Sequence, residues 1–172
     1  YDDEVDQKAA GKVYEMPSAN GKGKRAAVEL SGLWRVARYD DPKMDQNPYE
    51  PVKNLPEHDL KWMGIEVPSR NLWGVDEMVF GHRVLYRTKV DVPASLEGRG
   101  FKLHFSGTHW VVSVFVNGEL AGTHQGVWIP WDLDVSDEIQ PGKVNEITVA
   151  VKGSWYAFDI GTMRQDSLYD WR

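Results

Sequence analysis

Aromatic and acidic side chains are the residues of this sequence that could do chemistry. The chain holds eight Trp, seven Tyr and five Phe, and aromatic rings both fill protein cores and stack on flat apolar faces of ligands. Most of these rings are expected to pack in a core, because large apolar side chains are usually buried. The 26 Asp and Glu residues are spread along the chain, so spacing alone names no pair as a general acid and base.

Thiol and transition-metal chemistry are not predicted. The chain contains no Cys, which excludes disulfides, thiol catalysis and Cys-based metal sites. The spacing of the five histidines does not follow the H-x-x-x-H pattern of metal ligands on a helix, so no transition-metal site is expected. These histidines are His58, His82, His104, His109 and His124.

Charge and hydropathy argue against two classes of partner. The formal net charge is −6, whereas nucleic-acid-binding proteins carry basic stripes. The one basic cluster, Lys22 to Arg25, lies among glycines and is predicted to be a solvated loop. No apolar run approaches the ~20 residues that a membrane-spanning helix needs. The sequence therefore predicts a globular protein that binds neither nucleic acid nor membrane.

The elements that must position the candidate side chains are short strands. Val84, Tyr86, Val90 and Val92 alternate with polar residues, as expected for a strand with one buried face. The dipeptide Asn117-Gly118 provides the positive φ angles of a type I′ hairpin turn. Strands are predicted over residues 27–39, 62–68, 84–92, 101–105, 110–116, 119–123 and 145–151.

Two stretches are predicted to lie outside the sheet. Residues 1–26 are polar and are expected to be extended or partly disordered. Residues 40–56 contain four prolines, which indicates a long surface loop. No helical period longer than two turns is present, and turn signals recur about every ten residues. We therefore predict an all-β fold over residues 27–172, an antiparallel two-sheet jelly-roll sandwich of roughly eight to ten strands.

Several short motifs occur in a distinctive order. Leu30-Ser-Gly-Leu-Trp34 is followed by Ile65-Glu-Val-Pro-Ser69, then by Tyr86-Arg87 with Val92-Pro93, and then by Val116-Asn-Gly118. Further matching positions are Gly122, His124, Gly126, Pro130 and Asp134-Val135. Over roughly residues 30–172 the chain resembles the N-terminal sugar-binding domain of glycoside hydrolase family 2, the β-galactosidase, β-glucuronidase and β-mannosidase group. Leu85 stands where the family pattern usually has Trp.

The resemblance implies a galactose-binding-domain-like sandwich that is a fragment of a longer multidomain enzyme. Its partners would be carbohydrate and the immunoglobulin-like and (β/α)8 barrel domains of the same polypeptide. The two catalytic glutamates of a retaining mechanism would lie on the barrel, so this segment alone is expected to be inactive. An autonomous carbohydrate-binding module and a purely structural interdomain sandwich are the alternatives.

The resemblance also implies where substrate would be contacted. In the family, an aspartate in the loop after the last strand accepts hydrogen bonds from sugar hydroxyls, and Asp170 is the residue that we place there. The other candidates for substrate contact are aromatic or amide side chains: Trp155, Tyr156, Trp171, Asn71 and Trp73. His124 is expected to have a structural packing role, and Trp128 and Trp131 are expected to pack together as a corner of the core.

No cofactor is expected, with one alternative left open. Jelly-roll sugar binders often hold a structural calcium ion between loop carboxylates, and here Asp132, Asp134 and Asp137 are the candidates. The compartment is not readable from a chain without Cys that begins in polar sequence. Of the possible compartments, a periplasmic or secreted location is favoured over a cytoplasmic one.

Overall fold

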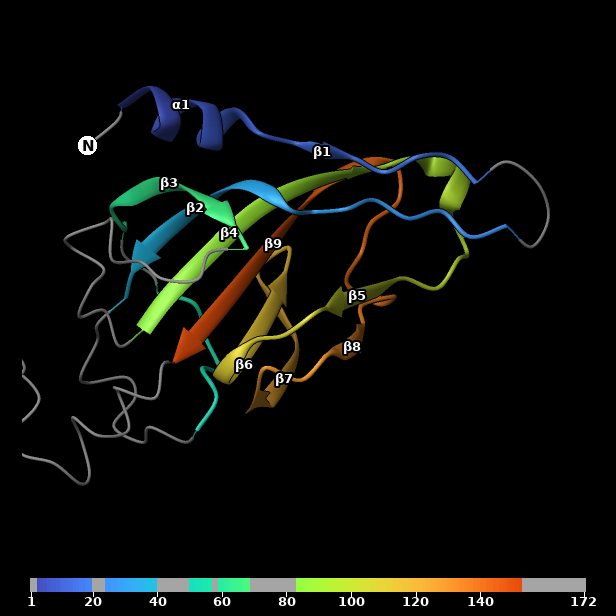
Figure 1. Cartoon of the computed structure of the whole chain (residues 1–172). Coiled ribbons are helices and arrows are strands. Elements are labelled where there is room, and N and C mark those ends of the chain that lie inside the picture. The colour runs from blue at the N-terminus through green and yellow to red at the C-terminus, as the bar shows by residue number, and fades with distance from the viewer. Residues whose placement is uncertain (1–2, 20–23, 40–49, 57–58, 69–82, 153–172) are drawn as a thin grey trace, which may run out of the picture.

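The computed structural model describes residues 3–19, 24–39, 50–56, 59–68 and 83–152 (Figure 1). Strands dominate this part of the chain, with one α-helix and one short 3-10 helix. In chain order the elements are α1 (Asp3–Gly11), β1 (Tyr14–Glu15), β2 (Gly32–Arg38), β3 (Trp62–Val67), β4 (Arg83–Val92), η2 (Ala94–Leu96), β5 (Lys102–Phe105), β6 (His109–Val116), β7 (Glu119–Val127), β8 (Trp131–Asp134) and β9 (Lys143–Lys152).

The strands form two sheets. The large sheet has the order β3-β2-β4-β9-β6-β7, and all of these neighbours are antiparallel. The short strand β1 adds to β4 in parallel, and β5 pairs with β8 in a separate two-stranded sheet. The predicted all-β, two-sheet sandwich is confirmed.

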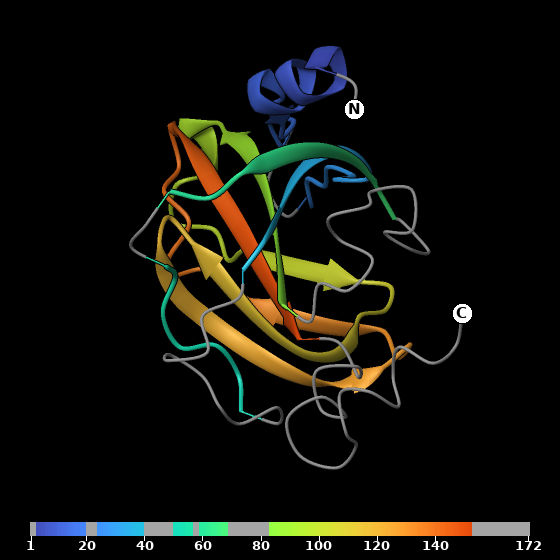
Figure 2. The same cartoon turned by 90° about the vertical axis from the view of Figure 1, so that its left-hand side faces the viewer.

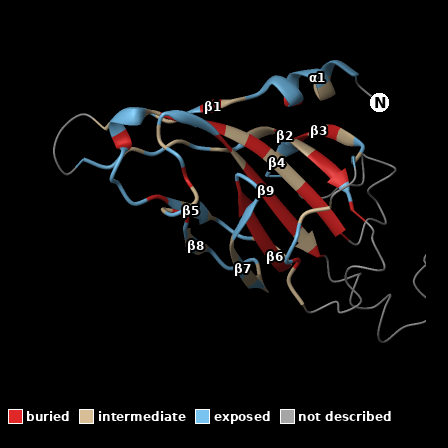
Figure 3. Ribbon diagram, turned by 180° about the vertical axis from the view of Figure 1, so that it is seen from behind, coloured by how far each residue is buried: buried red, intermediate tan, exposed pale blue. Residues whose placement is uncertain are grey.

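The main core lies on one face of the large sheet. Val36, Val112 and Val149 are buried there, and side chains of the small sheet such as Leu103 and Leu133 pack against the same cluster. Each fully buried aliphatic side chain contributes about 1.5–3 kcal/mol, so this cluster is the principal source of stability. Figure 3 shows the buried residues as red bands along the strands of the large sheet.

A second, smaller core covers the opposite face of the large sheet. Leu85, Phe115 and Ala150 are buried there together with Tyr39 and Val52. The segment 50–56 therefore packs on the sheet through Val52. This second core explains why side chains on both faces of β6 are buried, from Val111 to Val116.

Two predictions about the N-terminal third need correction. Residues 1–26 are not extended throughout, because Asp3–Gly11 form α1; acidic residues in its first turn suit the helix dipole, and Lys8 pairs with Glu4 at 2.6 Å. The strand predicted over residues 27–39 begins only at Gly32. Gly32 has a φ of 120°, outside the range of a regular strand. Before it, backbone carbonyls accept hydrogen bonds from side chains rather than from a neighbouring strand: Trp34 Nε1 donates to the Leu30 carbonyl at 2.6 Å.

The helix α1 lies outside the sheet beside its edge strand β3 (Figure 2). Asp6 Oδ1 accepts a hydrogen bond from the backbone N–H of Gly64 at 2.5 Å. A Cβ atom at Gly64 would lie 2.7 Å from the Val5 carbonyl oxygen, so glycine is what permits this close approach. The helix thereby covers an edge strand that could otherwise pair with another chain.

Candidate functional site

Four strands of the large sheet have their ends together at one end of the sandwich. Arg83, the first residue of β4, is opposite Lys152, the last residue of β9. Val111 of β6 is opposite the same Lys152, and His109 of β6 is opposite Val127 of β7. We call this the loop end of the sheet. In Figure 1 it is the lower left end, where β9 ends.

The loop end is where the segments with the predicted site residues join the sheet. Asn71 and Trp73 precede β4, and Trp155, Tyr156, Asp170 and Trp171 follow β9. All six lie outside the described residues, so their contacts with substrate stay a prediction. The topology nevertheless joins both segments to adjacent strands at the same end of the sheet, through Arg83 and Lys152.

Trp128 projects from the loop end into solvent. Its side chain is 70% exposed, and the adjacent Ile129 is 60% exposed. The His109 ring contacts two indoles in tilted arrangements, with its centroid 5.6 Å from that of Trp128 and 6.5 Å from that of Trp110. Both Trp128 and Trp110 have positive φ angles, 58° and 68°, which bulky residues rarely adopt and which cost of order 1–3 kcal/mol each.

Trp131 packs elsewhere, so the predicted pairing of Trp128 with Trp131 is wrong. The Trp131 ring is stacked between Phe105 and His124, at 4.3 Å from each and within 8° of parallel to both. Trp131 is carried by β8 of the small sheet and His124 by β7 of the large one. The expected packing role of His124 is confirmed, because its ring joins the two sheets.

The stack and the exposed loop are connected through Thr108. Trp131 Nε1 donates to the Thr108 hydroxyl at 2.9 Å, and the backbone N–H of Trp128 donates to the Thr108 carbonyl at 3.0 Å. A Cβ atom at Gly126 would lie 2.8 Å from His124 Nε2, so the stack needs glycine at this position. The partly buried stack therefore holds the turn from which Trp128 projects.

Two buried cations at the loop end were not predicted from sequence. Arg83 is 2% exposed and Lys152 is 0% exposed. Lys152 Nζ donates a hydrogen bond to the Glu50 carbonyl, which ties the segment 50–56 to the sheet. Strand alternation alone would place Lys152 and Thr148 on a polar face, but that face carries the second core, and Thr148 is only 2% exposed.

Two of the three carboxylates proposed for calcium, Asp132 and Asp134, have protein partners. Asp132 Oδ1 lies 2.7 Å from His104 Nδ1, and hydrogen bonds from His104 and then Lys102 hold the pKa of Asp132 below its usual range. Hydrogen bonds from Ser136 likewise lower the pKa of Asp134. Within the described residues, no group of three His, Asp or Glu side chains could hold a metal ion.

The loop end brings together groups that can contact a ligand. The loop end offers an exposed indole, a neighbouring imidazole and the two chain segments that enter and leave the sheet. The carboxylates Asp132 and Asp134 lie on β8, where hydrogen bonds lower the pKa of each. Among the described residues of the loop end, no general acid and base are identified as a pair.

Comparison with known families identifies the domain. The family model described as "Glycosyl hydrolase 2 galactose-binding domain-like" matches residues 66–167, more than half of the chain. The chain belongs to this family, as the sequence motifs predicted.

Relatives with assigned names are much longer proteins. A protein of Formosa agariphila that is provisionally named a β-glucuronidase is 27% identical over 117 residues, which cover 66% of this chain and 14% of the relative. A β-galactosidase of Thermoanaerobacter pseudethanolicus is 32% identical over 62 residues, 36% of this chain and 8% of the relative. The chain thus matches about a tenth of the length of these relatives.

Solved structures show the same fold. The β-glucuronidase of Faecalibacterium prausnitzii has a TM-score of 0.53 and 28% identity, over 73% of this chain and 20% of that one. The β-glucuronidase of Ruminococcus gnavus in complex with D-glucuronic acid has a TM-score of 0.57 and 23% identity, over 72% and 21%. In the part of the chain that the structure describes, no helix is long and apolar enough to cross a membrane.

Proposed function

We propose that this chain is a non-catalytic accessory domain of a family 2 glycoside hydrolase, and that its loop end forms part of the wall of the active site. Membership of the galactose-binding-like family supports the domain type. The observation that carries the proposal is the register of β4 with β9. Because the first residue of β4 lies opposite the last residue of β9, the segment that contains Asn71 and the segment that contains Asp170 connect to the sheet at the same end. The exposed Trp128 is at this end as well.

The enzyme that contains the domain would be a retaining β-glycosidase. The relatives are named as β-glucuronidase and β-galactosidase, which supports a carbohydrate substrate without choosing the sugar. Retaining hydrolysis needs two carboxyl groups about 5–5.5 Å apart, and in this family they belong to the barrel. The immunoglobulin-like and (β/α)8 barrel domains of the same polypeptide would then be the partners of this domain.

An autonomous carbohydrate-binding module is the second candidate, and the exposed surface weighs against it. Among the described residues, the large hydrophobic side chains that are exposed are Leu120, Trp128, Ile129 and Val144, of which only Trp128 is aromatic. Holding a polysaccharide without help takes several convergent groups. One indole with an adjacent Ile129 suits a surface completed by a neighbouring domain.

Titration calorimetry separates these two functions. We expect galactose and glucuronic acid to bind the isolated chain more weakly than about 1 mM, because an affinity of −4 to −8 kcal/mol, about mM to μM, needs several contacts. Micromolar binding of either sugar would establish the autonomous module and overturn the accessory role.

The role of Asp170 is tested in the complete enzyme. Replacing Asp170 with Asn removes a charge and one hydrogen-bond acceptor. A carboxylate-to-hydroxyl bond is worth ~1.5–3 kcal/mol, so kcat/KM should fall about ten- to a hundred-fold. Asp166→Asn, four residues earlier, is the matched control and should leave kcat/KM unchanged. An equal effect of both variants, or none of Asp170→Asn, would remove Asp170 from the active site.

A further inference from the structure

A notch lies beside the middle of β4, where this strand changes its neighbour. The strand β2 pairs with β4 as far as Arg87, opposite Arg35. The strand β1 pairs with β4 on the same edge from Val90 onward, opposite Tyr14. Residues 88 and 89 lie between the two pairings, and the end of α1 passes beside them.

The notch is a small hollow with a basic lining. It is shallow and open to solvent, with a cavity volume of about 10 Å³. Four of its seven lining residues are cationic, and the other three are Ala9, Ala10 and Thr88. The cations are Lys12, Arg35, Arg87 and Lys89. On a chain with a net charge of −6, this is a local reversal of sign.

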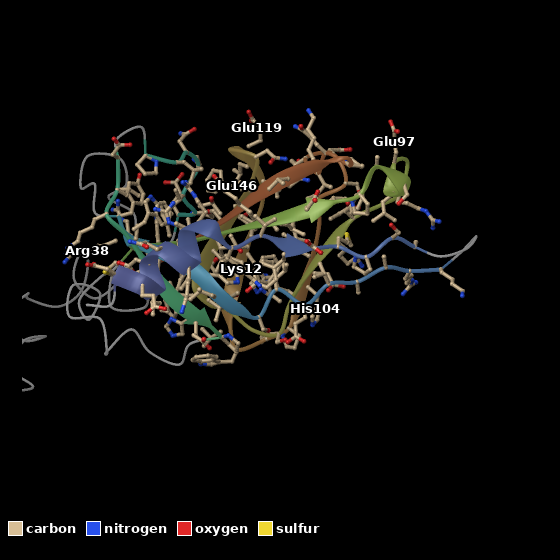
Figure 4. The ribbon with its side chains drawn as sticks, turned by 90° about the horizontal axis from the view of Figure 1, so that it is seen from above. Lys12, Arg38, Glu97, His104, Glu119 and Glu146 are labelled. Atoms are coloured by element: carbon tan, nitrogen blue, oxygen red, sulfur yellow. The ribbon has the colours of Figure 1, made fainter. Side chains whose placement is uncertain are left out.

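The charges of the lining are only partly balanced. Arg87 Nε lies 3.3 Å from Glu146 Oε1, and it also donates to the Thr148 hydroxyl at 3.1 Å. Among the described residues, Glu146 is the one carboxylate in an ion pair with any of the four cations. Figure 4 shows Lys12 beside α1 and Glu146 further across the sheet. Within the described residues, the other three cations of the lining make no ion pair.

The two arginines are held close together despite their like charges. Arg35 and Arg87 are directly opposite each other in the β2–β4 register, a placement that is destabilising for like charges. Both guanidinium groups contact the Trp62 ring, at 5.2 and 4.3 Å from its centroid. The Trp62 ring therefore holds both guanidinium groups next to each other.

One further observation agrees with a site for an anion. Burial lowers the pKa of Arg87, Glu146 acts against this, and the charge of Arg35 lowers the pKa further. An oxyanion would relieve the repulsion between the two arginines.

We propose that this notch binds an oxyanion group of a small ligand, held chiefly by the guanidinium forks of Arg35 and Arg87, with Lys12 and Lys89 completing the positive surface. Arginine forks match sulfate, phosphate and carboxylate oxygens in pairs. The contacts of Arg87 with Glu146 and Thr148 both use Nε, so they do not engage the two terminal nitrogens of its guanidinium group. The site is separate from the loop end and does not depend on the proposed glycosidase function.

The test is an NMR titration of the 172-residue chain, following the Nε–H signals of its arginines. Sodium sulfate, sodium phosphate and sodium acetate are the probes, each added at constant ionic strength by exchange against sodium chloride. Saturable shifts of the Arg35 and Arg87 signals at millimolar probe concentration are expected. Saturation by sulfate and phosphate alone would assign a tetrahedral anion, and saturation by acetate alone would assign a carboxylate.

Substitutions decide whether the notch is the site. Arg35→Gln should raise the dissociation constant at least ten-fold, and Arg35→Lys should raise it less, because charge is kept while the fork is lost. Lys89→Gln provides a second test that leaves the contacts with Trp62 intact. Arg99→Gln is the control, since Arg99 is an exposed cation on a loop. Linear shifts spread equally over all arginines, or an affinity unchanged by both Arg35→Gln and Lys89→Gln, would overturn the proposal.

Discussion

The two ends of the large sheet are built in opposite ways. At the end away from the loop end, β6 and β7 are joined by the Asn117-Gly118 turn, whose φ angles of 53° and 89° confirm the predicted type I′ geometry. The Asn117 amide donates to Asn145 Oδ1 at 2.8 Å and to the Glu138 carbonyl at 2.9 Å. We call this the turn end.

The turn end satisfies its buried polar groups. Asn145 is 0% exposed. Its Oδ1 accepts from Asn117 and from the Gln140 backbone N–H at 2.7 Å. Its Nδ2 donates to the carbonyls of Gln140 and Lys143 at 3.0 and 2.9 Å.

The loop end instead carries two tryptophans with positive φ and an exposed apolar pair, Trp128 and Ile129. Strain and exposed apolar surface are typical of functional sites, and complete satisfaction is typical of a structural end.

Asn145→Ala should give the largest loss of stability. The substitution removes four hydrogen bonds in the interior and leaves partners such as the Asn117 amide without their contact. At about 1 kcal/mol for each bond, the loss should be roughly 3–4 kcal/mol, and at ~2–4 °C per kcal/mol the melting temperature should fall by about 10 °C. Thermal unfolding measures it.

The control for this prediction is Gln140→Ala at the same end. Gln140 is exposed, and its backbone, which makes the bonds to Asn145, is retained. Its melting temperature should stay close to that of the parent chain. A fall of less than about 2 °C for Asn145→Ala would show that the turn end is not the structural end of the sheet.

Trp131 and Trp128 should differ in their contribution to stability. Trp131→Ala removes the ring that joins Phe105 to His124 and should cost about 3 kcal/mol. Trp128→Ala removes a ring that is 70% exposed and should change the free energy of unfolding by less than about 0.5 kcal/mol. Urea unfolding of both variants checks the contrast, and equal losses would mean that Trp128 belongs to the core.

Alkaline pH tests the core that lies between the two ends. Burial raises the pKa of Tyr86 to about 12, above the value of 10 in the unfolded chain. Its contribution to stability is therefore complete below pH 10 and is lost as the pH rises from 10 to 12. The loss should reach roughly 2–3 kcal/mol. Tyr86→Phe should flatten the stability curve over this window, and an identical curve for the variant would contradict the shift.

The main sheet could be predicted because its signals are local. Ile147, Val149 and Val151 alternate with polar residues, and Asn117-Gly118 identifies its own turn. The burial of Lys152 could not be predicted, since it depends on the segment around Glu50, about a hundred residues away in sequence. The helix α1 was missed because a helix this short depends on docking, here of Val5 and Asp6 on Gly64.

The candidate site was predictable only in part. Trp128 and Trp131 are three positions apart and of the same type, and no local signal shows that one is exposed while the other is stacked. The notch was missed for a related reason. Lys12, Arg35 and Arg87 come from three distant segments, and only the fold brings them together. The role of Asp170 rests on family resemblance and on the register that joins its segment to the loop end.

Turnover by the isolated chain tests the central proposal most directly. The purified 172-residue chain would be assayed on chromogenic β-glucuronides, β-galactosides and β-mannosides, and then purified a second time and assayed again. We predict no hydrolysis above the buffer rate for any of the three substrates, because the catalytic glutamates would lie on another domain. Hydrolysis that persists and co-purifies with this polypeptide would contradict the assignment of a non-catalytic domain.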